Sequence, residues 1–328
     1  MKRLLVIGVL LALVLSASPR AAAQGITEQK EVTAFLFGTF HPLNADGTPM
    51  KDAHGQPIAV EMPLGTGFFV MYPDKRGGPT FGFCYLATAK HVLRDFDGTF
   101  LSKLKVRLNL KKPVGDIEVD FVNDVAVTDA SANLLWLHDD KDPADEAVAI
   151  PLLPDEHKFE FKTIPLTMFV DDAQLKSDAV VEGDNLYFIG LMAQFYGARH
   201  NYPIVRRGTL AMMSDEKIDT PAGPQKAFIT ELQSWPGNSG SPVFLSLGGL
   251  RGGSLMVGQK FSFLGILTGA FQNKLVAPIV GEQDIKFKSG NELPTGVSFI
   301  VPATRLREVL ESQEAQRRRD AEINGLSR

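Results

Sequence analysis

Residues 237–242 have the sequence Gly-Asn-Ser-Gly-Ser-Pro, so that one serine, Ser239, lies between two glycines. A nucleophilic serine needs an exposed hydroxyl and backbone N–H groups that converge on the oxygen of a tetrahedral intermediate. Glycine permits the sharp turn that brings such N–H groups together. Because Gly, Ser and Pro also build ordinary turns, the hexapeptide by itself is weak evidence for a catalytic serine.

A second motif lies far upstream and supplies a histidine. Residues 88–92 have the sequence Thr-Ala-Lys-His-Val and follow an apolar stretch, as expected for a strand that ends beside a cleft. A serine hydroxyl is a poor nucleophile at neutral pH, so it needs a base within reach, and a carboxylate must hold that base in the correct tautomer. We therefore predict that His91 is the base that serves Ser239.

Together these motifs resemble those of the chymotrypsin-like (trypsin-fold) serine proteases, in particular the bacterial exported type without a C-terminal PDZ domain. Similar stretches at 65–70, 183–190 and 296–302 extend the resemblance over residues 35–310. The resemblance implies an all-β protein made of two packed six-stranded antiparallel β-barrels with a C-terminal helix. It also implies a serine endopeptidase that acts on protein or peptide substrates through an acyl-enzyme, without a metal or organic cofactor.

Two aspartates compete for the carboxylate that orients His91. Asp145 opens the sequence Asp-Glu-Ala-Val, similar to the family's D-x-A-V strand start, although Glu146 stands where an apolar residue is usual. Asp124 opens Asp-Val-Ala-Val, which matches the local pattern slightly better. The intervals of about 45 and about 93 residues in the chymotrypsin template favour Asp145. We predict the triad His91, Asp145 and Ser239 and keep Asp124 as the alternative acid.

The resemblance also assigns residues around the serine. It implies that the N–H groups of Gly237 and Ser239 form the oxyanion hole. Asn238 replaces the aspartate through which some members are activated by a new N-terminus, so no such activation is expected. An uncharged Gln233 beside the substrate pocket argues against selection of Lys or Arg, and we expect a small or apolar substrate side chain there. Substrate backbone is expected to pair, as an added strand, with Thr268, Gly269 and Ala270.

Composition and the N-terminus narrow the function class. The chain has 328 residues and a formal net charge of −4, which gives no reason to expect nucleic acid or an anionic membrane surface as a partner. Cys84 is the only cysteine, so no intrachain disulfide forms, and its apolar neighbours predict a buried strand thiol. Residues 1–23 combine a basic start, a short apolar stretch and an A-x-A cleavage site, which predicts a signal peptide. We expect an exported protein, periplasmic or secreted, without stable membrane insertion; the oligomeric state stays open.

Beyond residue 32, short apolar runs are broken by Gly, Pro, Asn and Asp, which predicts strands and hairpins. We expect an N-terminal barrel at 24–156 with the histidine and aspartate, a C-terminal barrel at 157–302 with the serine, and a helix and tail at 303–328 that is frayed from Arg317 onward. The insertions at 43–63 and 248–261 have no assignment. The predicted strands are 33–40, 67–72, 81–88, 105–110, 117–121, 134–138, 147–152, 185–191, 204–212, 227–232, 241–245, 263–271 and 296–301.

Two other functions stay open. A trypsin-like fold can serve as a catalytically silent binding module, in which the oxyanion loop has an inactive shape. An esterase or other acyl hydrolase is the second alternative, although the G-x-S-x-G elbow of the α/β-hydrolases is missing from the sequence.

Overall fold

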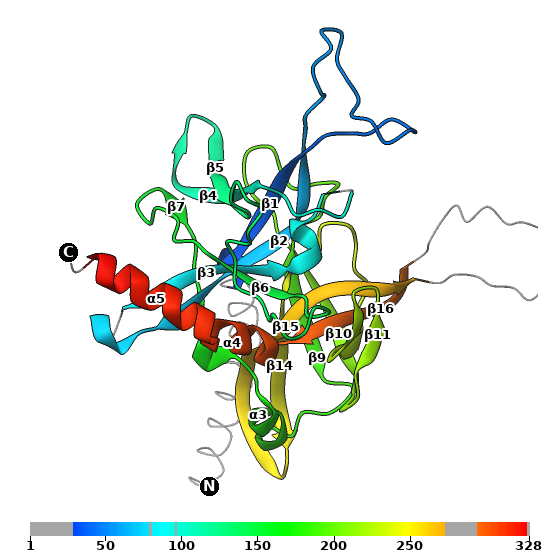
Figure 1. The fold of residues 1–328 in the computed structure, drawn as a ribbon. Coiled ribbons are helices and arrows are strands. Elements are labelled where there is room, and N and C mark those ends of the chain that lie inside the picture. The colour runs from blue at the N-terminus through cyan, green and yellow to red at the C-terminus, as the bar shows by residue number, and fades with distance from the viewer. Residues whose placement is uncertain (1–28, 79–80, 96, 273–293, 327–328) are drawn as a thin grey trace, which may run out of the picture.

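The computed structural model describes residues 29–78, 81–95, 97–272 and 294–326, which form two β-sheet units packed against each other and two C-terminal helices (Figure 1). The predicted signal peptide at 1–23 lies outside the described residues. Among the residues described, no helix is long and apolar enough to cross a membrane.

The first unit is a mainly antiparallel sheet with the strand order β5-β4-β1-β2-β3-β6. Two short strands extend it, since β7 pairs with β4 and β8 pairs with β2. The chain therefore stays with the first unit through β8, which ends at Pro165. The strands are β1 (Thr33–Phe40), β2 (Val60–Pro73), β3 (Gly82–Ala89), β4 (Lys103–Val114), β5 (Ile117–Ala126), β6 (Ala147–Pro151), β7 (Phe159–Glu160) and β8 (Ile164–Pro165).

The second unit is a closed six-stranded antiparallel barrel with the order β10-β13-β16-β15-β14-β9. A small hairpin, β11 and β12, extends from the connection between β10 and β13. The 248–261 insertion is the far part of the long β14–β15 hairpin. The strands are β9 (Asn185–Gly190), β10 (Ile204–Met213), β11 (Ile218–Thr220), β12 (Gly223–Gln225), β13 (Phe228–Glu231), β14 (Pro242–Arg251), β15 (Ser254–Gln272) and β16 (Pro294–Pro302).

The all-β prediction is confirmed, and one predicted strand is wrong. Most strands are longer than predicted because their ends continue as hairpin arms. Residues 134–138 form only isolated bridges, between Thr128 and Leu134 and between Leu137 and Ala149. Their apolar side chains instead anchor a loop, since Trp136 and Leu137 are buried in the core of the first unit.

One apolar cluster joins the two units. Phe68 on β2 contacts Phe263 on β15, with ring centroids 5.2 Å apart, and Phe169 contacts the same ring at 4.7 Å. All three rings are buried, and such tilted aromatic pairs add to the stability that burial gives. Cys84 is buried beside this cluster, as predicted, and burial raises the pKa of its thiol to about 12. The packed junction fixes segments of the two units relative to each other.

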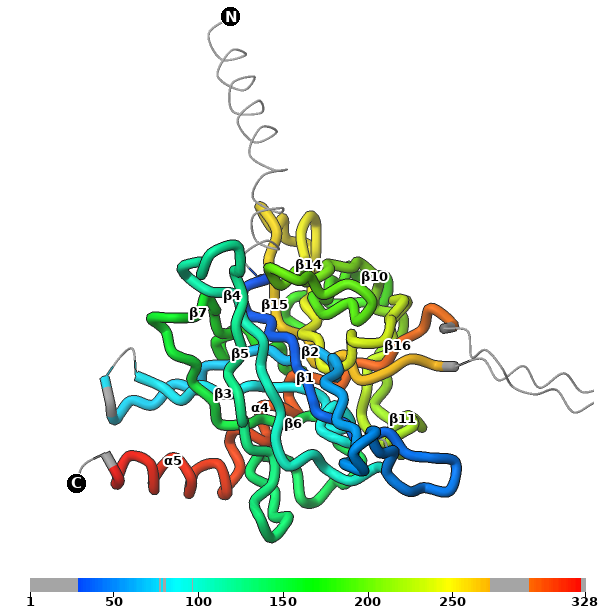
Figure 2. Tube along the Cα trace, turned by 90° about the horizontal axis from the view of Figure 1, so that it is seen from above, coloured from blue at the N-terminus to red at the C-terminus, as the bar shows by residue number. Residues whose placement is uncertain are grey.

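The C-terminal region forms two helices, α4 (Ala303–Glu311) and α5 (Gln313–Leu326), which pack along the first unit (Figures 1 and 2). The expected fraying from Arg317 onward is wrong. Arg319 is among the largest fully buried side chains; its Nη1 donates to the carbonyl of Leu310 at 2.7 Å, and its guanidinium lies 3.9 Å from the centroid of the Tyr72 ring. Three consecutive arginines predicted a solvated tail. The sequence does not show that the side chain of one of them, Arg319, is buried against the first unit.

We expect Arg319→Ala to lower the free energy of unfolding by about 2–4 kcal/mol, measured by urea denaturation. The change removes a desolvated cation–π contact and leaves the carbonyl of Leu310 without its donor. Arg317→Ala is the matched control, because the Arg317 side chain is 74% exposed and, among the described residues, has Glu314 as its one ion-pair partner. Its effect should stay below about 1 kcal/mol. Equal losses in the two variants would contradict the assignment of Arg319 as an anchor.

The insertion at 43–63 contains two copies of one turn that the sequence analysis missed. Residues 43–49 (Leu-Asn-Ala-Asp-Gly-Thr-Pro) and 51–57 (Lys-Asp-Ala-His-Gly-Gln-Pro) align position by position. In each copy the second residue donates its N–H to the carbonyl of the sixth, at 2.7 and 2.8 Å, and the first and seventh residues form a bridge. The fifth residue is glycine with a φ of 82° or 79°, a conformation that favours glycine. The copies form an arm that extends from β1 and β2 (Figure 1).

Candidate active site

His91 lies on a 3₁₀ turn, Lys90–Leu93, that directly follows β3. The pairing of β3 with β6 ends at Ala89 and Ala147, and one more backbone hydrogen bond joins the N–H of Lys90 to the carbonyl of Glu146 at 2.8 Å. This register places the residue before β6 next to the histidine. The register between β3 and β6 therefore determines which acidic residue contacts His91.

Glu146 is the carboxylate that contacts His91. Its Oε2 accepts a hydrogen bond from the His91 backbone N–H at 3.0 Å and lies 2.6 Å from His91 Nδ1. The Glu146 side chain is 6% exposed, whereas the His91 side chain is 41% exposed. Because a carboxylate only accepts hydrogen bonds when ionised, the proton of neutral His91 lies on Nδ1. The Nε2 atom is left as the acceptor.

The pKa of Glu146 is lowered although the group is buried. Burial acts to raise this pKa, since it disfavours the charged form. The hydrogen bonds and charge of His91 act the other way and outweigh burial, with help from the nearby Lys90 ammonium. Glu146 is therefore ionised at neutral pH and able to stabilise a positively charged His91.

Asp145, the predicted partner of His91, lies elsewhere. Its Oδ1 accepts the N–H of Ala147 at 3.1 Å, and its Oδ2 lies 3.2 Å from Nη2 of Arg305 on α4. Side chains of successive residues in an extended chain point to opposite sides, which explains why Asp145 and Glu146 have different partners. Burial raises the pKa of Asp145, opposed by Arg305. The prediction that Asp145 contacts His91 is wrong by one residue.

Asp124, the alternative acid, is also away from His91. It lies near the end of β5 with a φ of 56°, and its exposed carboxylate pairs with Lys103 on β4. The local sequence match was therefore misleading, because β5, the strand that contains Asp124, pairs with β4 and not with β3.

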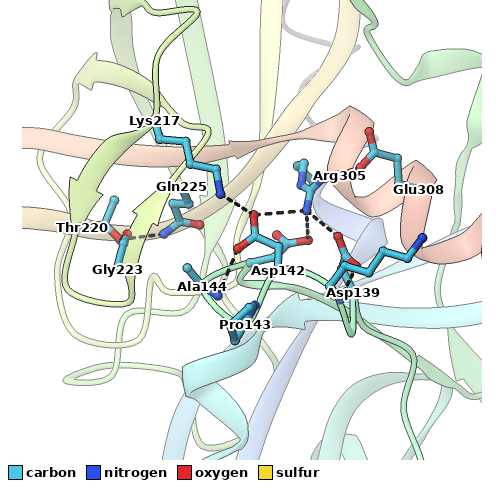
Figure 3. A network of polar contacts seen from close by, with 12 residues as sticks. Asp139, Asp142, Pro143, Ala144, Lys217, Thr220, Gly223, Gln225, Arg305 and Glu308 are labelled. Atoms are coloured by element: carbon cyan, nitrogen blue, oxygen red, sulfur yellow. Dashed lines mark hydrogen bonds and ion pairs between the residues drawn. The ribbon is translucent and has the colours of Figure 1, made fainter.

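A polar network holds the loop that leads into β6. Nη2 of Arg305 lies 2.8 Å from Asp139 Oδ2, 3.7 Å from Asp142 Oδ2 and 3.2 Å from Asp145 Oδ2. Lys217, from the second unit, approaches Asp142 from the other side at 3.0 Å (Figure 3). Two segments from outside the first sheet, α4 and the β10–β11 connection, thus converge on this loop.

Ser239 lies in a loop made of two successive turns. The N–H of Asn238 donates to the carbonyl of Trp235 at 2.9 Å, and the N–H of Ser241 donates to the carbonyl of Asn238 at 3.0 Å. The third residue of each turn is a glycine with positive φ, 94° at Gly237 and 84° at Gly240, the pattern of type II turns. Pro236 occupies the favoured second position of the first turn. The glycines of the motif are thus required by the backbone.

The N–H groups predicted to form the oxyanion hole both point away from the turns. The carbonyl of Pro236 accepts the N–H of Ala193 at 3.3 Å, and in a planar trans peptide the next N–H, that of Gly237, points the opposite way. The same reasoning applies to the peptide between Asn238 and Ser239. The carbonyl of Asn238 accepts the N–H of Ser241, so the N–H of Ser239 points the opposite way. Among the described residues neither N–H has a hydrogen-bond acceptor.

The serine and histidine segments meet at Gly65 on β2. A Cβ atom at Gly65 would lie 2.8 Å from the carbonyl oxygen of Ser239 and 3.1 Å from both methyl groups of Val92, the neighbour of His91. A side chain there would push the two segments apart. Within the described residues no hydrogen bond joins Ser239 Oγ to His91; in free enzymes such bonds are often long and tighten only with substrate.

Asn238 is fully buried and fastens the serine loop to the end of β9. Its Oδ1 accepts the N–H of Trp235 at 2.7 Å, and its Nδ2 donates to the carbonyl of Leu191 at 2.6 Å. Both ends of the amide are therefore paired inside the protein. No new N-terminus is needed to complete these contacts.

The predicted substrate-binding residues lie at the surface beside this loop. Gln233 is exposed, and its Oε1 is 3.4 Å from Nη2 of Arg206. The pairing of β15 with β14 ends at Ile266, whereas its pairing with β16 continues. On the side away from β16, residues 268–270 have no strand partner in the described part of the chain, which leaves that side open to an added strand.

Comparisons with known proteins give structural likenesses only. No protein-family model and no curated protein matches the sequence. Structures of the HtrA-type protease AlgW with a decapeptide and of a variant of it are 16% identical, with TM-scores of 0.45 and 0.46; each match covers 89% of this chain, which spans 66% of theirs. The MamO protease domain from Magnetospirillum magneticum is 13% identical, with a TM-score of 0.44, over 88% of this chain and 100% of that domain. Likenesses at these values assign no activity.

Proposed function

We propose that the protein is a serine endopeptidase in which Ser239 is the nucleophile, His91 the general base and Glu146 the carboxylate that orients His91. The observation that carries the proposal is the paired contact of Glu146 Oε2 with the backbone N–H and Nδ1 of the same histidine. This contact fixes the ring and leaves Nε2 unprotonated, as a general base must be.

The chemistry follows from these positions. Ser239 Oγ attacks the peptide carbonyl, and His91 Nε2 takes the hydroxyl proton and passes it to the leaving amine. Water then attacks the acyl-enzyme: His91 takes a proton from the water and passes it to Ser239 Oγ, which leaves as the acid product forms. Glu146 stays ionised and stabilises the imidazolium that forms. The N–H groups of Gly237 and Ser239, which have no acceptor among the described residues, would hold the oxyanion, and no metal or cofactor is needed.

Two features favour this function over the alternatives. A catalytically silent module with a collapsed serine loop is expected to turn one of the two N–H groups inward, whereas both lack an internal acceptor among the described residues. The open edge at 268–270 suits an extended peptide better than a small ester, because its main-chain groups would pair along a strand. Export remains a prediction from residues 1–23.

An active-site-directed organophosphonate tests the nucleophile. We expect one equivalent to label Ser239 in the wild-type protein and none to bind Ser239→Ala. Ser241→Ala is the matched control, because Ser241 is fully buried two residues away and its Oγ has no hydrogen-bond partner in the described structure. It should be labelled like the wild type.

The outcome separates the three functions. Wild-type protein labelled no more than Ser239→Ala would be a silent module, and the proposal would be wrong. Labelled protein that cleaves activated esters but nothing in a peptide library would be an esterase. Cleavage of library peptides at defined bonds would support the endopeptidase and define the side chain preferred beside Gln233.

A further inference from the structure

We propose that Thr66, on β2 of the first unit, is a positioning residue for the oxyanion hole of the second unit. The proposal rests on the proposed function of Ser239 and goes beyond it by naming what holds the serine loop in shape. Thr66 was singled out in the sequence only as part of a strand motif, with no role of its own.

The hydroxyl of Thr66 bridges two segments of the second unit. It accepts the backbone N–H of Leu191, at the end of β9, at 2.8 Å. Its proton is therefore free to be donated to the carbonyl of Gly237, which lies 2.9 Å away. Thr66 and Leu191 are fully buried, so water does not compete for the bond between them, whereas Gly237 is half-buried. One hydroxyl thus satisfies the N–H of Leu191 and the carbonyl of Gly237 at the same time.

The backbone of Thr66 holds the same loop a second time. Its N–H donates to the carbonyl of Ser239 at 2.9 Å, and its own carbonyl accepts the hydroxyl proton of Thr88 at 2.8 Å. Thr88 lies at the end of β3, three residues before the histidine. The serine loop is therefore attached through β2 to β3, the strand that leads directly into the histidine turn.

These contacts fix the peptide that carries one oxyanion donor. Thr66 holds the carbonyl of Gly237 and the carbonyl of Ser239, which belong to the peptides on either side of the Asn238–Ser239 peptide. With both flanking peptides fixed, the N–H of Ser239 has little freedom to rotate. Leu191 closes the arrangement, because its N–H binds the Thr66 hydroxyl and its carbonyl binds the Asn238 amide.

Two glycines show how closely the parts fit. A Cβ atom at Gly240 would overlap the carbonyl oxygen of Thr66 and the hydroxyl of Thr88. A Cβ atom at Gly190 would lie 3.0 Å from the hydroxyl of Thr66 and would overlap the Ser241 hydroxyl. The loop has no room to shift toward β2, so the Thr66 hydroxyl contacts a backbone that is already confined.

The test compares variants that keep either the shape or the hydroxyl of Thr66. We expect Thr66→Val to lower kcat for a peptide substrate about ten- to a hundredfold with KM within about twofold, and to slow phosphonate labelling equally, because the oxyanion donor is no longer held. Thr66→Ser keeps the hydroxyl and should restore both rates to within about threefold of wild type. Thr230→Val is the matched control, since Thr230 is also fully buried and donates to a single carbonyl, that of Ser298, within the second barrel.

The results separate the two proposals. Wild-type protein that does not react with the phosphonate would overturn the enzyme and the role of Thr66 together. Reactive wild type with equal kcat in Thr66→Val, or a loss in Thr230→Val as large as in Thr66→Val, would overturn the Thr66 proposal alone. If valine prevents folding, Thr66→Cys replaces it, because a thiol is a weak donor. A kcat for Thr66→Cys equal to that of Thr66→Ser would then overturn the proposal.

Discussion

Glu146→Gln is expected to lower kcat for peptide hydrolysis by about 10⁴-fold while leaving KM and the fold nearly unchanged. An amide can donate to His91 Nδ1, which moves the ring proton to Nε2 and leaves no acceptor for the Ser239 proton. It also removes the negative charge that stabilises the imidazolium. Carboxylate-to-amide changes in Ser-His-Asp sites have effects of this size. Steady-state kinetics with a library-derived peptide, and circular dichroism for the fold, provide the measurement.

Asp145→Asn is the internal control for that prediction. Asn keeps an oxygen that can accept the N–H of Ala147, and Arg305 retains Asp139 as its partner. We expect a loss in kcat of less than about tenfold. If Asp145→Asn abolished turnover and Glu146→Gln did not, the assignment of the acid to Glu146 would have to be given up.

The pH dependence of stability provides a separate check on Glu146. Its pKa is lowered in the folded protein, so the ionised group stabilises the fold fully above its unfolded pKa of about 4.3. This contribution is lost as the pH falls through the lower folded value. The difference in unfolding free energy between wild type and Glu146→Gln should therefore shrink between about pH 5 and pH 3. A difference that grows over this range would contradict the lowered pKa.

The strands were predictable from sequence because each one shows its own alternation of apolar residues and ends at turn residues. The acid was not, because its identity depends on a register between β3 and β6 that no local pattern encodes. Asp145 and Glu146 are adjacent, both are buried, and a shift of one residue exchanges their partners. The motif contained one signal, since Glu146 occupied a position where an apolar residue was expected. A buried acid at such a position needs a partner.

The sequence did not predict the long-range polar contacts either. The Thr66 contacts join residues more than a hundred positions apart. The sequence around Thr66 predicts a strand but gives no sign of these contacts. Asn238 is different, because some proteins with this motif carry an aspartate at the same position. The presence or absence of a charge there therefore matters. The sequence predicted that this position is not activated by a new N-terminus, and the structure gives the amide two internal partners.

Asn238→Asp is expected to lower kcat/KM about a hundredfold at pH 8 and by much less at pH 5. A carboxylate can still accept the N–H of Trp235, but its second oxygen would face the carbonyl of Leu191, which the amide now contacts at 2.6 Å. The site is fully buried, so the pKa of the new carboxyl should be raised. Once protonated it can donate to Leu191 and restore the loop. The predicted loss has the size of a missing oxyanion donor.

The measurement is the ratio of kcat/KM in the variant to that in wild type across the pH range, because protonation of His91 affects both proteins and cancels in the ratio. A folded pKa above the unfolded value of about 3.9 means that the deficit is small at low pH and grows as the pH rises through the folded value.

Asn201→Asp is the matched control. Asn201 is also buried and donates to a carbonyl, but its Oδ1 faces the guanidinium of Arg107 at 2.7 Å, so a charge there is compensated. Its ratio should stay near one at every pH. A ratio for Asn238→Asp that is equally low at pH 5 and pH 8 would mean that the loop does not depend on the donor at this position.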